Sequence, residues 1–491
     1  MVPLDPVPRP IDHLLGFGSG DALVMARDTL SYAAAERRVG ELAGWLASFG
    51  FAPGARVATW LPKTLEACLM PLAAPRAGLV HVPVNPVLKR AQVAHILADS
   101  DASLLLTAAA RAATLAAGDA PEDCKVATEA GRGEALPPSN ADPHALAALM
   151  YTSGSTGRPK GVMLSHANLW LGAVSVAHYL EVTPDEHVLA VLPLGFDAGQ
   201  SQLLSTWRAG ATAVPLDYLL PRDVMKAVQR FEITSITAVP PLWTQLLALD
   251  WGDTGASVRR IANTGGALTP AMIDRMRLCF PNADIFPMYG LTEAFRSTYL
   301  DPAEVRSHPT SMGRAIPFAE VMAVRPDGNA AAAGEPGELV HAGPLVAQGY
   351  WRDPDRTAQR FRPTPDWATS GGMAVWSGDT VRRDAEGRFF FAGRDDEMIK
   401  TMGQRVSPFE VEAAALDSGE AVEAVAWGVA DAAAGALIRL AVSGAGDDAR
   451  LMTHLKRELP SYMVPAMIER RADLPRNANG KLDRVAVRTL S

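Results

Sequence analysis

The sequence predicts an α/β protein with a large N-terminal domain of parallel-type sheets and helices, a β-barrel-like subdomain, and a small α+β C-terminal domain. Three observations support this class. Strand-like and helix-like segments alternate through the first part of the chain, as in βαβ units. From Gly313 onward, short strands alternate with turns instead. With 491 residues, 48% of them hydrophobic, the chain exceeds the usual single-domain size and has enough apolar side chains for large cores.

The alternating segments are short, and each strand-like run is apolar. A stretch rich in Ala, Gly, Glu and Pro, residues 108–142, interrupts them and is expected to be a surface excursion. In chain order we expect helix 33–49, strand 56–62, helix 64–77, strand 78–86, strand 103–107, helix 168–180, strand 187–192, helix 200–209, strand 211–216 and strand 284–288.

The last part of the chain is predicted to form two further units. Turns at residues 325–329, 334–337 and 384–387 separate short strands, which favours an antiparallel, barrel-like subdomain. A polar break at residues 393–396 then precedes a helix, a strand and a helix. We therefore place the domains at residues 1–395 and 396–491, with the C-terminal elements expected at 408–416, 421–429 and 448–458.

Composition excludes several classes of protein. A net charge of −8 and a pI near 5.7 argue against a nucleic-acid surface. The three cysteines, Cys68, Cys124 and Cys279, are far apart and fit a reducing cytoplasm better than a disulfide scaffold or zinc site. The first residues lack the apolar core of a signal peptide, and no apolar run is long enough for a membrane span. We expect a cytoplasmic protein.

The most informative segment is residues 151–161, YTSGSTGRPKG. Apolar stretches at 145–150 and 162–164 flank it, so it is expected to be a loop between strands. Glycines, hydroxyls and the cations Arg158 and Lys160 can wrap a polyphosphate, because glycine lets the backbone amides approach the anion. The spacing is not that of a Walker A loop. The alternative is a flexible Ser/Gly linker.

Five further motifs follow. Residues 289–293 (YGLTE) come after a strand-like run, at the end where open α/β sheets bind ligands, although a helix-capping turn would look similar. Residues 263–267 (NTGGA) could otherwise be an ordinary strand-to-helix turn, and the charged stretch 393–408 a solvated linker. A fourth motif is residues 377–379 (SGD). A last motif, residues 475–484, holds Lys481 in a Gly/Asn turn that could simply be surface.

Taken in this order, the motifs closely resemble those of the adenylate-forming superfamily, which contains acyl-CoA synthetases, firefly luciferase and nonribosomal peptide adenylation domains. The resemblance covers residues 151–484 and is compatible with the N-terminal alternation. It implies two half-reactions. A carboxylate and ATP first give acyl-AMP and pyrophosphate, and a thiol then attacks the acyl-AMP. The implied cofactors are ATP and Mg²⁺, with CoA or a phosphopantetheinyl carrier protein as acceptor.

The resemblance also implies roles for individual residues. Thr292 and Glu293 would contact phosphate and magnesium, Glu293 as the metal ligand, and Asp379 would bind the ribose hydroxyls. The full set expected around ATP is Thr152, Ser153, Gly154, Ser155, Thr156, Gly157, Lys160, Gly265, Gly266, Ala267, Tyr289, Gly290, Asp379 and Arg394. Residues 348–354 also match the family, and we expect a structural role for them.

The C-terminal domain is expected to be mobile. Lys481 would swing in to bridge the substrate carboxylate and the α-phosphate, a role suited to a compact ammonium. Asp396 matches the family's hinge, and Lys400 and Gly403 match the face that meets the phosphopantetheine arm. Many relatives carry an aromatic residue where this chain has Gln404, which leaves the shape of the thiol tunnel open.

The acid pocket carries one ambiguous charge. Asp197 stands where amino-acid adenylation domains have an Asp, so it could bind a substrate amine. Alternatively it pairs with Arg296 and says nothing about an amine; an unpaired Arg296 could bind a second carboxylate or other oxygen group. The other residues expected in the wall are mostly small or polar and predict a polar, short-to-medium acid: Phe196, Ala198, Ser201, Ala238, Thr264, Met288 and Ser297.

The substrate and acceptor stay open. The motifs most resemble a bacterial subgroup of acyl-CoA ligases associated with exosortase systems, and also stand-alone amino-acid:carrier-protein ligases. No carrier domain follows Ser491, so any carrier protein is expected to be a separate chain, unless the thiol is CoA. A luciferase-like oxidase and a catalytically silent nucleotide-binding regulator are the rival functions. Retention of Lys481, Glu293, Asp379 and Lys160 argues against the silent regulator.

Overall fold

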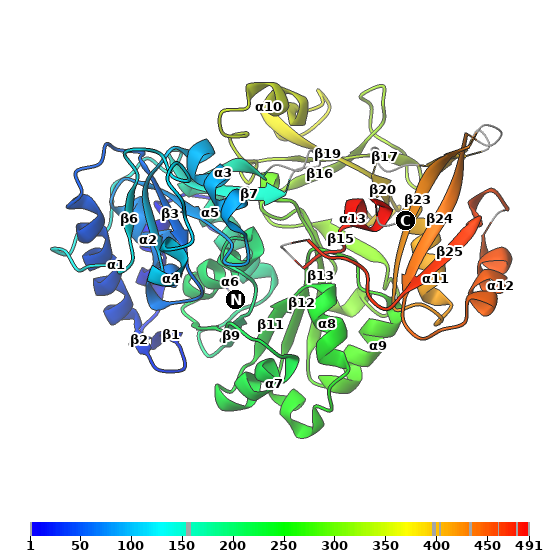
Figure 1. The fold of residues 1–491 in the computed structure, drawn as a ribbon, viewed down its shortest axis with the longest axis horizontal. Coiled ribbons are helices and arrows are strands. Elements are labelled where there is room, and N and C mark those ends of the chain that lie inside the picture. The colour runs from blue at the N-terminus through cyan, green and yellow to red at the C-terminus, as the bar shows by residue number, and fades with distance from the viewer. Residues whose placement is uncertain are drawn as a thin grey trace.

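The computed structural model describes residues 2–153, 159–394, 399–401, 404–431, 435–459, 461–477 and 480–489. Among these residues two large sheets with their helices form an N-terminal body, and a small domain of strands and helices lies beside it at the C-terminus (Figure 1). This confirms the predicted α/β class with its small α+β domain. The boundary expected at Asp395 and Asp396 falls outside the described residues and stays a prediction.

The first sheet ends at residues 151–161, the segment rich in hydroxyl groups and glycine that is called the hydroxyl-rich motif below. Within the described residues it has six strands in the order β6-β5-β3-β4-β7-β8. Its pairings are parallel except for β7 with β8, which are antiparallel. These two strands include residues 151–153 and 159–161 of the motif, so its two ends form strand where a loop was predicted. The strands are β3 (Arg56–Trp60), β4 (Val80–Pro83), β5 (Ala102–Thr107), β6 (Lys125–Ala127), β7 (Leu146–Ser153) and β8 (Pro159–Ser165).

The helices of this part begin at capping hydroxyls. Ser31 accepts a hydrogen bond from the Ala34 amide and Thr64 accepts one from Ala67, which satisfies amides that the first turn leaves free. Helix α2 is buried along most of its length despite two prolines, because it packs between α1 and the sheet. The helices are α1 (Tyr32–Ala47), α2 (Leu65–Arg76), α3 (Arg90–Ser100) and α4 (Ala109–Ala112).

The second sheet carries the predicted ligand edge. Its parallel part has the order β10-β9-β11-β12-β13, so the carboxyl ends of these strands lie along one edge. Helices α5 and α6 pack against each other on one face, while α7, α8 and α9 belong to a second core. The elements are β1 (Asp21–Val24), β2 (Thr29–Ser31), α5 (His166–Tyr179), β9 (His187–Ala190), α6 (Asp197–Arg208), β10 (Thr212–Pro215), α7 (Pro221–Arg230), β11 (Ser235–Ala238), α8 (Pro240–Leu247), β12 (Arg260–Asn263), α9 (Pro270–Cys279) and β13 (Asp284–Tyr289).

The strands after Gly313 are antiparallel, as predicted. They continue the second sheet through β14 in the order β16-β17-β19-β20-β15, and among the described residues no pairing closes them into a separate barrel. The elements are β14 (Thr298–Tyr299), β15 (Ser311–Ala315), β16 (Glu320–Val324), β17 (Pro336–Ala342), α10 (Pro354–Arg360), β18 (Phe361–Pro363), β19 (Met373–Arg383) and β20 (Phe389–Arg394).

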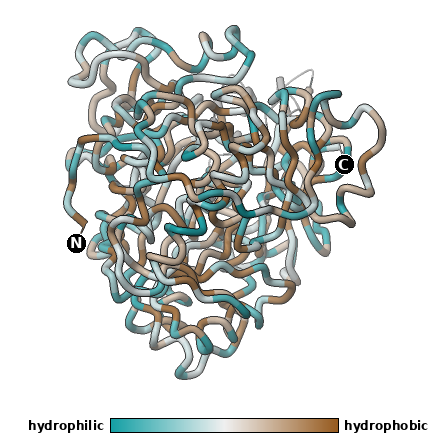
Figure 2. The backbone as a smooth tube through the Cα atoms, turned by 90° about the vertical axis from the view of Figure 1, so that its left-hand side faces the viewer, coloured by the Kyte–Doolittle hydropathy of each residue, from teal (hydrophilic) through white to brown (hydrophobic). Residues whose placement is uncertain are grey.

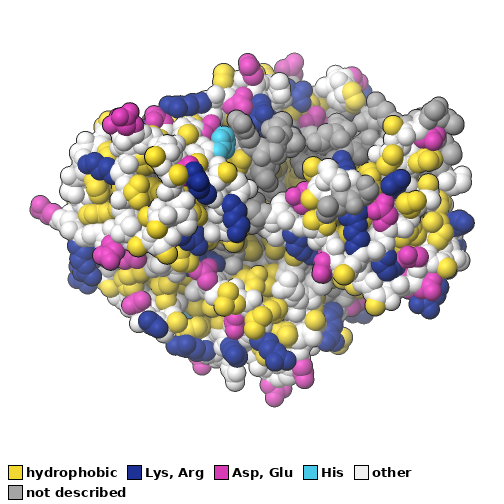
Figure 3. Space-filling view, viewed as in Figure 1, with side chains coloured by type: hydrophobic (Ala, Val, Ile, Leu, Met, Phe, Trp, Pro, Cys, Tyr) yellow, Lys and Arg dark blue, Asp and Glu magenta, His cyan; other side chains and the backbone are white. Residues whose placement is uncertain are grey.

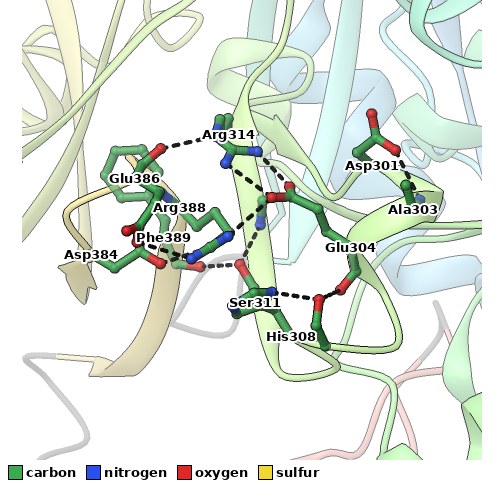
Figure 4. A network of polar contacts seen from close by, with 12 residues as sticks. Asp301, Ala303, Glu304, His308, Ser311, Arg314, Asp384, Glu386, Arg388 and Phe389 are labelled. Carbon is green, nitrogen blue, oxygen red and sulfur yellow. Dashed lines mark hydrogen bonds and ion pairs between the residues drawn. The ribbon is translucent and has the colours of Figure 1, made fainter.

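A polar network fixes β15 against β20 (Figure 4). Both carboxylate oxygens of Glu304 accept from Arg314, at 2.5 and 3.0 Å, and one also accepts from Arg388 at 3.0 Å. Hydrogen bonds from Arg314 are the largest influence lowering the pKa of Glu304. Arg388 in turn donates to Asp384 at 2.7 Å. The network thereby supports β19, the strand next to β20.

The C-terminal domain has its own core. Strands β23 and β24 are antiparallel and β25 joins β24 in parallel, with α11, α12 and α13 packed around them. The three elements predicted at 408–416, 421–429 and 448–458 are confirmed. The elements are β21 (Ile399–Thr401), β22 (Gln404–Val406), α11 (Pro408–Asp417), β23 (Glu423–Asp431), β24 (Gly435–Ser443), α12 (Asp448–Glu458), β25 (Met467–Arg471) and α13 (Arg484–Thr489).

The distribution of side chains follows the cores. Hydrophobic segments run through the interior of the backbone trace, and hydrophilic ones gather in its outer loops (Figure 2). On the face shown in Figure 3, acidic and basic side chains are interspersed. No helix within the described ranges is long and apolar enough to cross a membrane. The three cysteines are free thiols.

Candidate active site

The β7–β8 hairpin brings two predicted phosphate-binding residues opposite each other. Thr152 and Lys160 are partners across the strand pair. The Thr152 hydroxyl is buried and has no hydrogen-bond partner in the described part of the chain, so it is available to a ligand. The side chain of Ser153 and all of Gly154, Ser155, Thr156 and Gly157 lie outside the described residues, and their roles stay predictions.

Lys160 and Glu293 meet at a tyrosine. The Lys160 ammonium donates to the Tyr350 hydroxyl at 2.7 Å, and that hydroxyl donates to Glu293 Oε1 at 2.6 Å. The Lys160 Nζ and Glu293 Oε1 atoms are 3.7 Å apart. Burial lowers the pKa of Lys160, while the Glu293 carboxylate acts in the opposite direction. Burial, and then Glu293, raises the pKa of Tyr350, so its hydroxyl keeps the proton that it donates.

Tyr350 was not among the residues predicted to form the site. Its segment does have the expected structural role, since it bridges to Val162 and the Trp351 amide donates to Gly161 at 2.8 Å. The same segment also projects a hydroxyl between two predicted site residues. The sequence does not show these contacts, because they join positions that are distant along the chain. The one available signal was a tyrosine, which carries a hydroxyl, within a motif that matches the family.

The predicted nucleotide residues come from the ends of β12 and β13 and from β19. The Tyr289 hydroxyl donates to the Asp379 carboxylate, which is 7% exposed. The Asn263 side chain donates to the Gly266 carbonyl at 2.7 Å and thereby closes the turn after β12. Gly265 in this turn has φ +75°, a conformation that glycine adopts without steric cost. The backbone of Arg394 pairs with Asp379 across β19 and β20, whereas its side chain lies outside the described residues.

Three further predicted residues surround this turn. Gly290 follows β13 where a side chain could not fit, since a Cβ there would lie 2.8 Å from Arg296 Cα. Thr292 is buried in the short helical turn that also carries Glu293, and Ala267 is exposed beyond Gly266. Glu293 Oε2 takes part in no hydrogen bond among the described residues, and no cluster of three or more metal-ligating side chains is present among them.

Lys481 reaches this site from the C-terminal domain. Its ammonium lies 5.6 Å from the centre of the Phe196 ring. A Cβ built on Gly265 would lie 3.1 Å from its Cε, so the lysine packs directly over the glycine. The red segment near the C-terminus runs back from its domain toward the N-terminal body (Figure 1). The structure therefore brings Lys481 together with the turn at residues 263–267, which is predicted to bind the nucleotide and is here called the nucleotide turn. It also brings Lys481 to Phe196, in the part of the site predicted to bind the acid, here called the acid end. Asp396 and Gly403 lie outside the described residues, as does the side chain of Lys400.

A buried ion pair stands at the acid end. Arg296 Nη1 donates to Asp197 Oδ2 at 2.8 Å, and the two side chains are 4% and 5% exposed. Asp197 is the first residue of α6, where the helix dipole favours a negative charge. The same Nη1 donates to the Phe295 carbonyl at 2.5 Å, and Phe295 has φ +62°, which turns the chain between Glu293 and Arg296. Of the two alternatives for Asp197, the structure shows the internal pair.

Most of the remaining predicted wall residues are buried. The Ser297 hydroxyl lies 2.9 Å from His341 Nδ1, and burial lowers the pKa of His341 to about 3, so the ring is neutral at ordinary pH. Tyr179 packs on this side and donates to the Met288 sulfur at 2.9 Å. The other predicted wall residues are also buried, namely Ala198, Ser201, Ala238 and Thr264.

Comparison with known proteins places this arrangement in a family. The fold is that of the adenylate-forming enzymes, which use ATP. The chain belongs to the AMP-binding enzyme family, whose model matches residues 16–351, and the model of the AMP-binding enzyme C-terminal domain matches residues 410–481. It is an adenylate-forming ligase, and the superfamily predicted from the motifs is confirmed.

Individual relatives cover nearly the whole chain. A feruloyl-CoA synthase of Amycolatopsis sp. is 35% identical over 94% of this chain and 93% of its own. An L-proline--[L-prolyl-carrier protein] ligase of Pseudomonas fluorescens is 32% identical over 98% of both chains. The crystal structure of ATP-bound MatB from Rhodopseudomonas palustris superposes with a TM-score of 0.90 at 26% identity, covering 99% of both chains.

Proposed function

We propose that this ligase activates a small carboxylic acid without an ammonium group, using ATP and Mg²⁺, and transfers the acyl group to a phosphopantetheine thiol. The observation that carries the proposal is the convergence of Lys481 on Phe196 and Gly265, which joins the acid end of the site to the nucleotide turn. The contact leaves one ammonium beside both reactants.

In the first step an acid oxygen attacks the α-phosphorus of ATP. The bond between that phosphorus and the bridging oxygen breaks, and pyrophosphate leaves with the electron pair. Lys481 offsets the repulsion between carboxylate and phosphate, while Thr152 and Lys160 hold the leaving phosphates. Asp379, positioned by Tyr289, accepts hydrogen bonds from the ribose hydroxyls.

Glu293 fits the role of metal ligand. One of its oxygens is held by Tyr350, which leaves Oε2 for a cation. Magnesium commonly binds proteins through one or two carboxylates together with substrate phosphates, so a single carboxylate at this point is sufficient. When bound, the ion would neutralise charge on the phosphates. The chain's own contribution is the orientation of Glu293 by Tyr350 and Lys160.

In the second step the thiol sulfur attacks the acyl carbonyl carbon. The bond from that carbon to the AMP oxygen breaks, AMP leaves, and the thiol proton passes to solvent or to the AMP phosphate. We assign the hinge for this step to Asp396 and the thiol passage to Lys400 and Gly403, from the family resemblance. Relatives include both a CoA ligase and a carrier-protein ligase, so the common chemistry is the phosphopantetheine thiol. Use of ATP also supports the cytoplasmic location that the isolated cysteines suggest.

The substrate lacks an ammonium group on this proposal because Asp197 is already neutralised by Arg296. An amine would have to break that pair and leave the guanidinium buried without a counter-ion.

The test is acid-dependent exchange of labelled pyrophosphate into ATP. Exchange with an unaminated acid supports the proposal, and exchange with amino acids alone would contradict the assignment of substrate. Lys481→Ala is expected to lower exchange by at least about 100-fold while preformed acyl-AMP still reacts with CoA or a loaded carrier protein. Equal loss of both steps would remove Lys481 from the adenylation step.

A further inference from the structure

A narrow cavity continues from the acid end of the site along α6. It begins at Ala198, Met288 and Arg296 and passes Ser201 to reach Ser205. The α6 residues that line it recur every three or four positions, so they form one stripe on the helix. A helix rises about 1.5 Å per residue, so the stripe from Ala198 to Ser205 is roughly 10 Å long. The free space of about 20 Å³ beside it must widen to admit a short acyl tail.

The hydroxyls along the cavity fall into two groups. Ser205 and Thr206 donate to carbonyls one turn earlier in α6, at 2.6 and 2.5 Å, so their protons are already used. Ser201, Ser235 and Thr237 differ, because no hydrogen bond within the described ranges engages their hydroxyls although they are only 3%, 3% and 7% exposed. Their oxygens open onto the cavity and are not sealed in the packing, so these three hydroxyls are available to a ligand with hydrogen-bonding atoms.

The frame that carries these hydroxyls is fixed. The Gln202 amide donates to the Leu189 and Thr237 carbonyls, both at 3.0 Å, and its oxygen accepts from the Leu192 amide at 3.0 Å. These bonds pin α6 to strands β9 and β11. The backbone that carries Ser201 and Thr237 is therefore held in place before a ligand arrives, which lowers the entropic cost of binding.

The charges at the entrance exclude an ionised tail. Asp197 and Arg296 neutralise each other and are both nearly inaccessible to water. A second carboxylate on the tail would compete with Asp197 for Arg296, and an ammonium would compete with Arg296 for Asp197. Either exchange leaves a buried charge without its partner, which is strongly unfavourable.

The opposite wall is aliphatic. Val176 of α5, Leu180 just after that helix and Val188 of β9 line the same cavity. The cavity thus combines a hydrocarbon surface with a row of free hydroxyls. We infer that the acid substrate carries an uncharged hydrogen-bonding oxygen, a hydroxyl or carbonyl, on a slim hydrocarbon tail. This inference rests on the proposed function and names the class of acid that it uses.

The experiment compares acids that share a skeleton. Butanoate, hexanoate and cinnamate are each tested in pyrophosphate exchange as the unsubstituted, hydroxyl-terminated, ammonium-terminated and carboxylate-terminated acid. We expect kcat/KM for the hydroxylated acid of at least one skeleton to exceed that of its unsubstituted partner by about tenfold or more. The ammonium and carboxylate forms should fall below both.

Variants connect the preference to the cavity. Thr237→Val keeps the shape and Ser235→Ala removes one oxygen, and each should reduce the hydroxyl preference by about tenfold while exchange with the unsubstituted acid is retained. Ser205→Ala is the matched control, since that hydroxyl is used within the helix, and it should leave the preference unchanged. Thermal unfolding verifies that each variant is folded.

Two results would overturn the inference in distinguishable ways. A preference for unsubstituted, ammonium or dicarboxylic acids on every skeleton, or a hydroxyl preference that survives both variants, would refute the substrate class and leave the ligase function standing. Silence with every acid, in an enzyme shown to be folded, would overturn the proposed function and this inference with it.

Discussion

The Asp197–Arg296 pair permits a stability prediction that is independent of any substrate. Asp197→Asn keeps the size of the side chain but removes the charge that balances Arg296. Arg296→Met keeps the length and leaves the carboxylate unpaired. Both side chains are about 95% buried and their atoms lie 2.8 Å apart, so each single change leaves a charge in a site that water scarcely reaches.

The expected magnitudes follow from that burial. Breaking a buried pair on one side costs about 3–5 kcal/mol, whereas replacing both partners by neutral groups of similar volume costs little. Asp197→Asn should lie near the low end, at about 3 kcal/mol, because Arg296 keeps its bond to the Phe295 carbonyl. Arg296→Met should cost somewhat less, since the first turn of α6 still favours the carboxylate. The double variant should recover most of the combined loss.

The assay is thermal unfolding of the four proteins, read as the order of their midpoints. Each single variant should unfold roughly 3 °C below the wild type, at about 1 °C per kcal/mol for a chain of this length, and the double variant should unfold above both singles. Coupling of this size is the signature of a direct interaction. If the single losses simply add in the double variant, or if each is below about 1 kcal/mol, the two residues do not form a buried pair and the reasoning on substrate charge fails with it.

Two other predictions concern buried polar groups, among them His81 of β4. Tyr350→Phe removes the hydroxyl between Lys160 and Glu293, so pyrophosphate exchange should fall about tenfold to 100-fold and require more Mg²⁺, with little change in thermal midpoint because the ring still packs; unchanged Mg²⁺ dependence would refute a positioning role. Burial lowers the pKa of His81 and of His341 to about 3, far below the usual value near 6.5. The unfolded chain therefore binds these two protons first, and stability should be full above about pH 6.5 and fall below it by up to about 2.7 kcal/mol per pH unit. Urea midpoints across pH 7 to 4 measure this slope, and a slope that His341→Asn does not reduce would exclude that histidine as a cause.

Much of the fold could be predicted because local signals and packing agree. Thr64 marks the start of α2, and the apolar runs around the hydroxyl-rich motif became β7 and β8. The antiparallel strands were predicted as barrel-like, yet they extend the second sheet, since sequence shows turns but not which strand pairs with which. Contacts between site residues that are far apart in the sequence were harder to predict. The pairing of Asp197 with Arg296 depends on the turn at Phe295, and the position of Tyr350 depends on a bridge between distant segments.

The contacts of Tyr350 with Lys160 and Glu293 also mean that both sheets contribute residues to the proposed phosphate site. Lys160 lies on the first sheet and Glu293 follows the second, while Tyr350 belongs to the segment that crosses from one to the other. A polyphosphate bound there would contact residues of both sheets and so link them. Bound nucleotide would thus raise the free energy of local opening between the two sheets. At low ATP concentration the enzyme would open there more often and be cleaved more readily by proteases.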